Sequence, residues 1–173
     1  MEEFVFKMVV LGEKTTGKTS LIRRYIHGSF EGRYAATIGL NVSNKKINLE
    51  NSSINLLIYD IEAENDFESL FEPFVEGSIA VIFVFDITRV ETFDAVETWV
   101  ERMKNLTKSS ALENTILIGN KIDLPRKIDK RDGEQLAKKI SSSHYLETSA
   151  KENIEVDLAF HYLAERILER NSS

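Results

Sequence analysis

Short apolar segments rich in β-branched residues alternate along this chain with longer segments of helical periodicity. This alternation is typical of an α/β fold in which helices cover both faces of a mostly parallel sheet. The near-continuous apolar segment Ile79–Phe85 predicts a central strand that is buried on both faces. Strands are expected over Phe4–Leu11, Asn41–Leu49, Ile54–Tyr59, Ile79–Phe85, Thr115–Gly119 and His144–Glu147. Helices are expected over Lys18–Ile26, Asp66–Val75, Glu91–Leu106, Lys130–Ile140 (capped by Asp129) and Val156–Leu168.

At 173 residues the chain has the length of one domain, which we expect to span residues 1–173. Its 22 basic and 28 acidic residues give a net charge of −6, which disfavours a role in coating nucleic acid or an anionic membrane. The absence of cysteine excludes disulfides, thiolate metal sites and a cysteine nucleophile. No apolar run is long enough to span a membrane, and Glu2 stands where N-myristoylation requires glycine. We therefore expect a cytoplasmic monomer, peripheral to membranes only indirectly or through a tail absent from this sequence.

The segment Gly12–Thr19 matches the pattern G-x-x-x-x-G-K-[ST], at the junction of the first expected strand and helix. In this pattern the glycines let backbone N–H groups wrap a chain of phosphates, and the start of the following helix adds partial positive charge. Lys18 supplies a formal positive charge, and the Thr19 hydroxyl is suited to ligate Mg²⁺. The expected phosphate-binding residues are Glu13, Lys14, Thr15, Thr16, Gly17, Lys18, Thr19 and Ser20.

The segment Asn120–Asp123 directly follows the expected strand Thr115–Gly119 and reads N-K-I-D. The carboxylate of Asp123 can accept hydrogen bonds from the N1–H and the exocyclic amine of guanine, whereas adenine has no such pair of donors. The segment Ser149–Lys151 follows the last expected strand, where it can support the same pocket. The expected guanine-binding residues are Asn120, Lys121, Asp123, Ser149, Ala150 and Lys151.

The order and approximate spacing of these motifs resemble those of the Ras-like small GTPases, and of the Rab branch most closely, over the whole chain. The segments that carry the resemblance are Gly12–Thr19, Thr37–Gly39, Tyr59–Asp60, Phe85–Thr88, Asn120–Asp123 and Ser149–Lys151. The resemblance implies a P-loop small-GTPase domain with a six-stranded, mostly parallel sheet, one antiparallel edge strand and five helices. It also implies a Mg²⁺-dependent GTP/GDP switch whose two switch loops bind effector and regulator proteins.

The resemblance assigns further roles residue by residue. Thr37 resembles the switch threonine that ligates Mg²⁺ and reports the γ-phosphate, and Asp60 resembles the acidic residue that holds Mg²⁺ through water. Phe30 resembles the aromatic residue that packs against guanine; the alternative is a core residue that anchors its loop. Ala63 stands where a backbone N–H meets the γ-phosphate. The resulting metal-site residues are Thr19, Thr37 and Asp60, and the resulting catalytic residues are Lys18, Thr37 and Glu64.

The second switch departs from the family pattern D-x-x-G-Q, because residues 60–64 read D-I-E-A-E. Ala63 replaces a glycine, and Glu64 replaces the glutamine that orients the attacking water. An ionised carboxylate only accepts hydrogen bonds, and Glu62 adds a second negative charge nearby. At an effective dielectric constant of about 20, one such charge about 5 Å from a phosphate oxygen costs about 3 kcal/mol. We therefore expect slow intrinsic hydrolysis, although Glu64 could instead accept the proton of the water.

Three other positions depart from the family. Lys14 stands where the family carries a small or short polar residue; it could reach over the γ-phosphate, pair with Glu64 or point into solvent. Val42 and Tyr59 replace the Phe and Trp that Rab proteins usually show towards effectors. The partners of Rab proteins are therefore not transferred to this chain, and the expectation that remains is effector binding around residues 38–42 and 63–74.

Two functions stay open from the sequence. The first is a switch that hydrolyses GTP to GDP and phosphate. The second is an interaction module that holds GTP with negligible hydrolysis, and residues 61–64 favour it without settling the choice. An ATP-dependent P-loop kinase is disfavoured by Asn120–Asp123 and by the lack of an obvious phosphate-closing lid.

Overall fold

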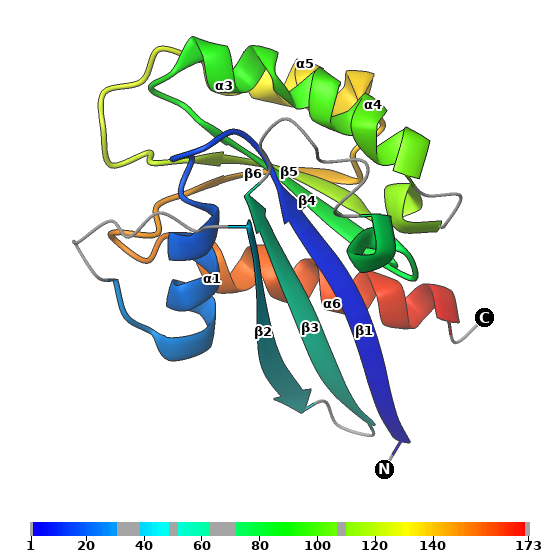
Figure 1. Ribbon diagram of the computed structural model, residues 1–173. Helices are drawn as coiled ribbons and strands as arrows, with labels where there is room; N and C mark the ends of the chain where they lie inside the picture. The colour runs from blue at the N-terminus through cyan, green and yellow to red at the C-terminus, as the bar shows by residue number, and fades with distance from the viewer. Residues whose placement is uncertain (1, 31–38, 49–51, 63–71, 107–109, 172–173) are drawn as a thin grey trace.

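The computed structural model describes residues 2–30, 39–48, 52–62, 72–106 and 110–171. Its six strands form one mixed sheet in the order β2-β3-β1-β4-β5-β6 (Figure 1). The strands are β1 (Glu2–Leu11), β2 (Gly39–Asn48), β3 (Ser52–Glu62), β4 (Ala80–Asp86), β5 (Thr115–Asn120) and β6 (His144–Thr148). Only the pairing of the edge strand β2 with β3 is antiparallel, and the other four pairings are parallel. The predicted six-stranded, mostly parallel sheet is confirmed.

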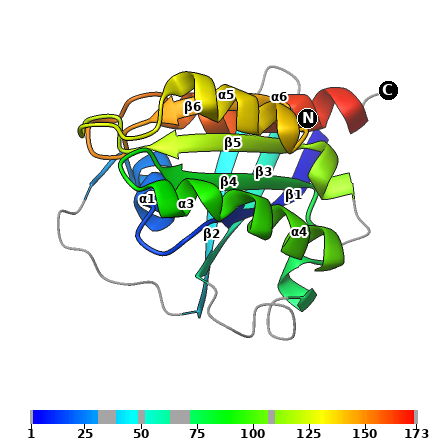
Figure 2. The same ribbon diagram turned by 90° about the horizontal axis from the view of Figure 1, so that it is seen from above.

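Helices cover both faces of this sheet, as predicted (Figure 1). They are α1 (Lys18–His27), α3 (Val90–Asp94), α4 (Val96–Leu106), α5 (Lys130–Lys139) and α6 (Val156–Asn171), with a 3₁₀ helix η1 over Ser110–Glu113. Figure 2 shows the sheet from above, with α3 and α4 on one side of it. Among the described residues, no helix combines the length and the apolar character needed to cross a membrane.

Two predicted helical features need correction, and a third lies partly outside the described residues. The helix expected over Glu91–Leu106 is divided at Ala95, whose ψ of −16° tightens the turn, although the Trp99 N–H still bonds to the Ala95 carbonyl. Asp129 occupies the N-cap position of α5, but its side chain makes no capping hydrogen bond; its backbone carbonyl accepts the bond from the Asp132 N–H instead. Of the helix expected over Asp66–Val75, only residues 72–75 are described, and they are helical.

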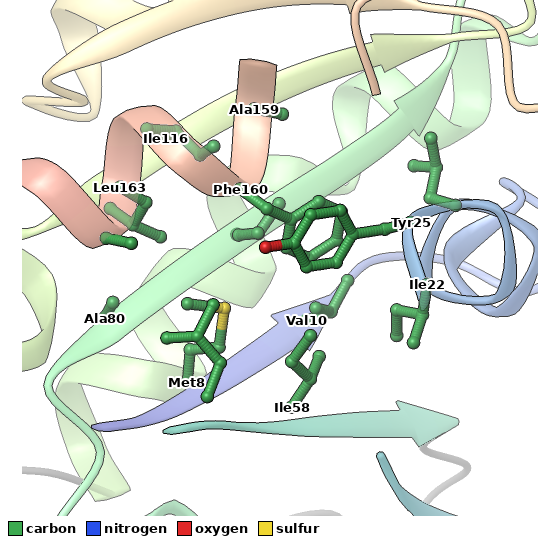
Figure 3. Packing of buried hydrophobic residues seen from close by; sticks show 14 of the residues in the cluster. Met8, Val10, Ile22, Tyr25, Ile58, Ala80, Ile116, Ala159, Phe160 and Leu163 are labelled. Atoms are coloured by element: carbon green, nitrogen blue, oxygen red, sulfur yellow. The ribbon is translucent and has the colours of Figure 1, made fainter. Parts of the chain in front are cut away.

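The sheet separates two apolar cores. On one face, Tyr25 of α1 stacks on Phe160 of α6 with a centroid distance of 4.2 Å and an interplanar angle of 7°, above side chains of β1 and β3 such as Met8 and Ile58 (Figure 3). On the other face, α3, α4 and α5 cover a cluster that includes Trp99. Every residue of β4 is buried. This confirms the prediction of a central strand for the apolar run that begins at residue 79, because a strand covered on both faces has no solvent-facing side.

Gly133 is a glycine inside α5 whose position is set by the neighbouring strand. A Cβ atom there would lie 2.2 Å from Cζ of Tyr145, and the Tyr145 hydroxyl is held by a hydrogen bond of 3.0 Å to Glu147. The Tyr145 ring also lies parallel to the Phe85 ring, with centroids 6.2 Å apart. Close packing of α5 against β6 therefore depends on the missing side chain.

We predict that Gly133→Ala destabilises the protein although alanine favours a helix by about 1 kcal/mol. The overlap with Tyr145 is expected to cost about 1–3 kcal/mol more than that gain, which lowers the midpoint of thermal unfolding by several degrees. Circular dichroism during heating measures this midpoint, and the neighbouring exposed change Glu134→Ala serves as the control. In a Tyr145→Ala background the substitution should become neutral or stabilising. A higher midpoint for Gly133→Ala in the wild-type background would show that the overlap is harmless.

Candidate functional site

The predicted motifs meet at one edge of the sheet, because parallel strands present their carboxyl ends on the same side. The loops that follow β1, β4, β5 and β6 lie there, and the last residues of β3 reach the same edge. β1 stands between β3 and β4, so that the chain order of the strands reverses beside it. Ligands of open α/β sheets bind at such a reversal point. The segment Gly12–Thr19 lies there, between β1 and α1 (Figure 1).

Two glycines of this loop stand where no other residue fits. Gly12 has φ of 151°, and a Cβ atom there would lie 2.1 Å from the carbonyl oxygen of Val84. Gly17 has φ of 97°, and its Cβ atom would lie 2.3 Å from the side-chain amide nitrogen of Asn120. Because both values of φ favour glycine and both spaces are filled by neighbours, the loop passes closely over β4 and β5.

Lys18 lies inside the curve of the loop, with only 5% of its surface exposed. Its Nζ donates hydrogen bonds of 2.8 Å to the carbonyl of Gly12 and 2.9 Å to the carbonyl of Glu13. Burial lowers the pKa of the ammonium, while the carboxylates of Asp60, Glu62 and Glu13 act in the opposite direction. The side chain is therefore a buried donor surrounded by loop carbonyls and nearby negative charge.

Thr19, the next residue, connects the start of α1 to the end of β3. Its Oγ1 donates a hydrogen bond of 2.5 Å to Oδ2 of Asp60. Asp60 is only 2% exposed, and burial raises the pKa of its carboxyl, opposed by the Thr19 hydrogen bond and by the charges of Lys18 and Arg23. The other carboxylate oxygen, Oδ1, is buried and has no hydrogen-bond partner among the described residues. A hydroxyl thus lies beside a carboxylate whose second oxygen has no hydrogen-bond partner among the described residues.

Asn120 joins the expected phosphate-binding segment Gly12–Thr19, called the phosphate loop below, to both loops of the expected base pocket. Its Nδ2 donates a hydrogen bond of 2.9 Å to the carbonyl of Thr16, 104 residues away in the sequence. Its Oδ1 accepts hydrogen bonds of 3.0 Å from Thr148 Oγ1 and 3.4 Å from the N–H of Ala150. One buried amide therefore holds three loops in a fixed arrangement.

Lys121 reaches back over the phosphate loop. Its Nζ lies 2.6 Å from the carbonyl of Thr15 and 2.7 Å from Oδ2 of the buried Asp86. Burial disfavours the charge of Asp86, but hydrogen bonds from Lys121 and Thr88 outweigh it and hold the pKa of this carboxyl below its ordinary value. Asp86 therefore anchors the lysine that braces the loop.

Asp123 is held by the loop after β6. Ser149 Oγ donates a hydrogen bond of 2.7 Å to Oδ1 of Asp123 and accepts one of 3.0 Å from the N–H of Glu152. Ser149 is fully buried, whereas Asp123 is half-buried, so the contact lies at the border between the core and the surface. This hydrogen bond fixes the orientation of the Asp123 carboxylate.

Arg24, which sequence reasoning did not single out, ties the end of α1 to the same pocket. Its guanidinium donates hydrogen bonds of 2.8 Å to each of the carbonyls of Ala150 and Lys151. The guanidinium carbon also lies 6.0 Å from the centre of the Phe30 ring. Phe30 is 39% exposed, which does not fit a core residue that anchors its loop. The ring instead lies at the surface beside Arg24.

Two further contacts of the phosphate loop were missed from the sequence. Trp99 Nε1 donates a hydrogen bond of 3.0 Å to Oε1 of Glu13, and Arg89 Nη1 donates to the Lys14 carbonyl at 3.2 Å and to Thr15 Oγ1. The position of Trp99 on the apolar face of α4 indicates only that its ring is in the core. Its hydrogen bond to Glu13 joins residues 86 positions apart, and no local pattern predicts it.

The remaining predicted residues are placed as follows. The side chain of Lys14 is exposed, and Ser20 is half-buried in the first turn of α1. Thr37, Ala63 and Glu64 lie outside the described residues, so their roles stay predictions.

Comparison with known proteins points in one direction. A model of the Ras family matches residues 7–169 of this chain. The Ras-related protein Rab-7b of Bos taurus is 36% identical over 173 residues, covering 96% of this chain and 84% of the relative.

Proposed function

Because this chain belongs to the Ras family of GTP-binding switches, we propose that it cycles between GTP- and GDP-bound forms, with slow intrinsic hydrolysis of GTP to GDP and phosphate. The observation that carries the proposal is the linkage through Asn120, which bonds the phosphate loop at Thr16 and the expected base pocket at Ala150. If the phosphate-binding and base-binding parts of a pocket are already held together, the protein loses less conformational entropy when the nucleotide binds.

In this proposal Asp123 binds guanine. Its carboxylate, oriented by the 2.7 Å bond from Ser149, accepts hydrogen bonds from the N1–H and the exocyclic amine of the base. The backbone N–H groups of Gly12–Thr19 and the Lys18 ammonium bind the phosphates. Phe30, whose ring lies beside Arg24, and the stem of Lys121, which reaches the Thr15 carbonyl, are proposed to bound the base.

The residues at the end of β3 and the start of α1 fit a Mg²⁺ ion. Magnesium takes hard oxygen ligands. Thr19 Oγ1 and Oδ1 of Asp60, which has no partner in the described part of the chain, offer a hydroxyl and a carboxylate oxygen at one place. Thr37 is the third proposed metal-site residue. When bound, Mg²⁺ neutralises the negative charge that develops on the phosphates.

Slow hydrolysis follows from the residues that replace Gly and Gln in the second switch. Glu64 cannot donate a hydrogen bond when ionised, and its negative charge is repelled by the oxygens of the γ-phosphate. The carboxylate of Glu62, which is 9% exposed, acts electrostatically on the Lys18 ammonium, and this supports a position close to Lys18 and the phosphates.

We predict that Glu64→Gln accelerates single-turnover hydrolysis of bound GTP by about tenfold or more, because the amide can both orient the water and accept from it. The rate is measured by the release of phosphate from protein preloaded with GTP and Mg²⁺. The exposed change Glu76→Gln is the control and should leave the rate unaltered. A wild-type rate equal to or above that of Glu64→Gln would contradict the slow-enzyme proposal.

The alternative is a module that holds GTP, recruits partners and hydrolyses negligibly. Chromatography of the nucleotide that co-purifies with the protein separates the alternatives: GTP favours the module and GDP the switch. Recovery of ADP or ATP would contradict both.

The proposed partners are effector and regulator proteins that bind through the two switch regions. In the described part of this surface, Val42 on β2 is paired with Tyr59 on β3 and is 47% exposed, while Lys7 Nζ lies 4.6 Å from the centre of the Tyr59 ring. Val42 and Tyr59 are smaller than the Phe and Trp that Rab proteins usually carry there, which supports partners different from theirs. A cytoplasmic monomer, peripheral to membranes indirectly or through a tail that this sequence does not contain, completes the proposal.

A further inference from the structure

Asp60 and Glu62 lie on the same face of β3. Alternate residues of a strand share a face, and Ile58 at the preceding position of this series belongs to the core under α1. Ile61, between the two carboxylates, belongs to the core on the opposite face. The bond from Thr19 to Asp60 confirms which way the series points. Glu62 therefore stands about 7 Å further along the strand, on the face where α1 begins.

Both carboxylates are buried, and both are incompletely bonded. Asp60 is 2% exposed and Glu62 is 9% exposed. Oδ1 of Asp60 and Oε2 of Glu62 are buried and have no hydrogen-bond partner among the described residues. A buried carboxylate is costly unless a cation or hydrogen-bond donors compensate its charge. Two unsatisfied oxygens on one face therefore indicate a missing positive charge.

Lys18 supplies only part of that charge. It bears one positive charge against two carboxylates, and its Nζ already donates to the carbonyls of Gly12 and Glu13. Asp60 and Glu62 both act electrostatically on the Lys18 ammonium, which indicates that both carboxylates lie near it. The charge of Arg23 acts on Asp60 as well, yet Oδ1 of Asp60 and Oε2 of Glu62 still have no hydrogen-bond donor among the described residues. Such carboxylate oxygens, close to the hydroxyl of Thr19, are the ligands that a hard divalent cation prefers.

We propose that Glu62 is a second carboxylate facing the divalent-cation position beside Thr19 and Asp60, so that this chain holds Mg²⁺ or Mn²⁺ more tightly than Asp60 and Thr19 alone would. The inference rests on the metal site of the proposed function and extends it to a residue of this chain's divergent second switch. Its consequence is that the GDP-bound form keeps its cation, and with it the nucleotide, at low concentrations of Mg²⁺.

The test is the affinity of the GDP-bound protein for Mn²⁺, measured from the electron paramagnetic resonance of the free ion. Glu62→Gln keeps the shape of the side chain and removes its charge, and it is expected to raise the dissociation constant about 10- to 100-fold. The same variant should release fluorescent GDP at a correspondingly higher concentration of Mg²⁺. Glu134→Gln, the same change at an exposed position of α5, should alter neither value.

Two further variants separate charge from packing and from a failure of the metal site itself. Glu62→Asp keeps the charge on a shorter stem, so a cation-binding role predicts tighter Mn²⁺ binding by Glu62→Asp than by Glu62→Gln, and a packing role predicts the reverse. If Asp60→Asn weakens Mn²⁺ binding but Glu62→Gln does not, this inference is wrong while the proposed metal site stands. If neither Asp60→Asn nor Glu62→Gln weakens Mn²⁺ binding, both the proposed metal site and the role of Glu62 are wrong. Tighter GTP binding by Glu62→Gln with unchanged Mn²⁺ affinity would mean that Glu62 competes with the γ-phosphate, and it would overturn the inference.

Discussion

Replacing Asp123 with asparagine is expected to lower the affinity for GTP by about 100- to 10,000-fold and to raise the affinity for xanthosine triphosphate. The wild-type carboxylate accepts from two donors of guanine, and each such bond to a charged group contributes about 1.5–3 kcal/mol. An asparagine amide would present a donor to the exocyclic amine of guanine, but it matches xanthine, which carries a carbonyl oxygen there. Because Ser149 donates to Asp123 Oδ1, the asparagine oxygen can keep that bond.

Isothermal titration calorimetry with GTP, ATP and xanthosine triphosphate measures this exchange of specificity. The wild-type protein should prefer GTP over ATP by about 1000-fold or more. Asp129→Asn is the matched control, because it makes the same change at an exposed position on the loop before α5 where the side chain forms no capping bond. Equal affinity of the wild-type protein for ATP and GTP would refute the assignment of the base.

The second large effect is expected from Lys18→Met, which should weaken GTP binding by about 100- to 1000-fold. The substitution keeps a linear side chain in the buried position but removes charge-assisted hydrogen bonds worth about 3–4 kcal/mol together. It also removes one of the two positive charges, Lys18 and Arg23, that act on Asp60, so that the phosphates would meet a more negative site. Calorimetry at a fixed concentration of Mg²⁺ gives the change in dissociation constant.

Lys139→Met is the control for Lys18→Met, because Lys139 forms an exposed ion pair with Glu97 on the face of α4 and α5, away from the phosphate loop. Its effect on GTP affinity should be less than twofold. A decrease of less than tenfold for Lys18→Met would mean that backbone N–H groups alone bind the phosphates, and the role assigned to the ammonium would be withdrawn.

The sheet could be predicted from the sequence because a strand that is buried on both faces consists of nearly continuous apolar, β-branched residues. The prediction ended the third strand at Tyr59, since the next residue is charged, whereas β3 continues to Glu62. Asp60 pairs with β1 and with β2 through the backbone, so the strand continues although this side chain is charged. The charged side chain is explained by the candidate site, not by the preference of a strand for apolar residues. Sequence patterns are least informative at such places, where local preference conflicts with function.

The site was predictable as a set of motifs but not as a network. Spacing alone placed Gly12–Thr19 and Asn120–Asp123 at the ends of strands, and the sheet brings them together. The bond from Asn120 to the Thr16 carbonyl spans 104 residues, and no local pattern indicates it. The burial of Glu62 was equally hidden, because it depends on the packing of β3 against the start of α1.

The bond between Trp99 and Glu13 has a practical consequence. Trp99 is the only tryptophan in the chain, and its indole N–H contacts a carboxylate of the phosphate loop at 3.0 Å. The protein thus contains a single indole, which can be excited at wavelengths that tyrosine does not absorb, and its emission is expected to respond to the charge and position of that loop. Loading and release of nucleotide can be followed optically on unmodified material, without attaching a dye whose bulk could disturb the pocket.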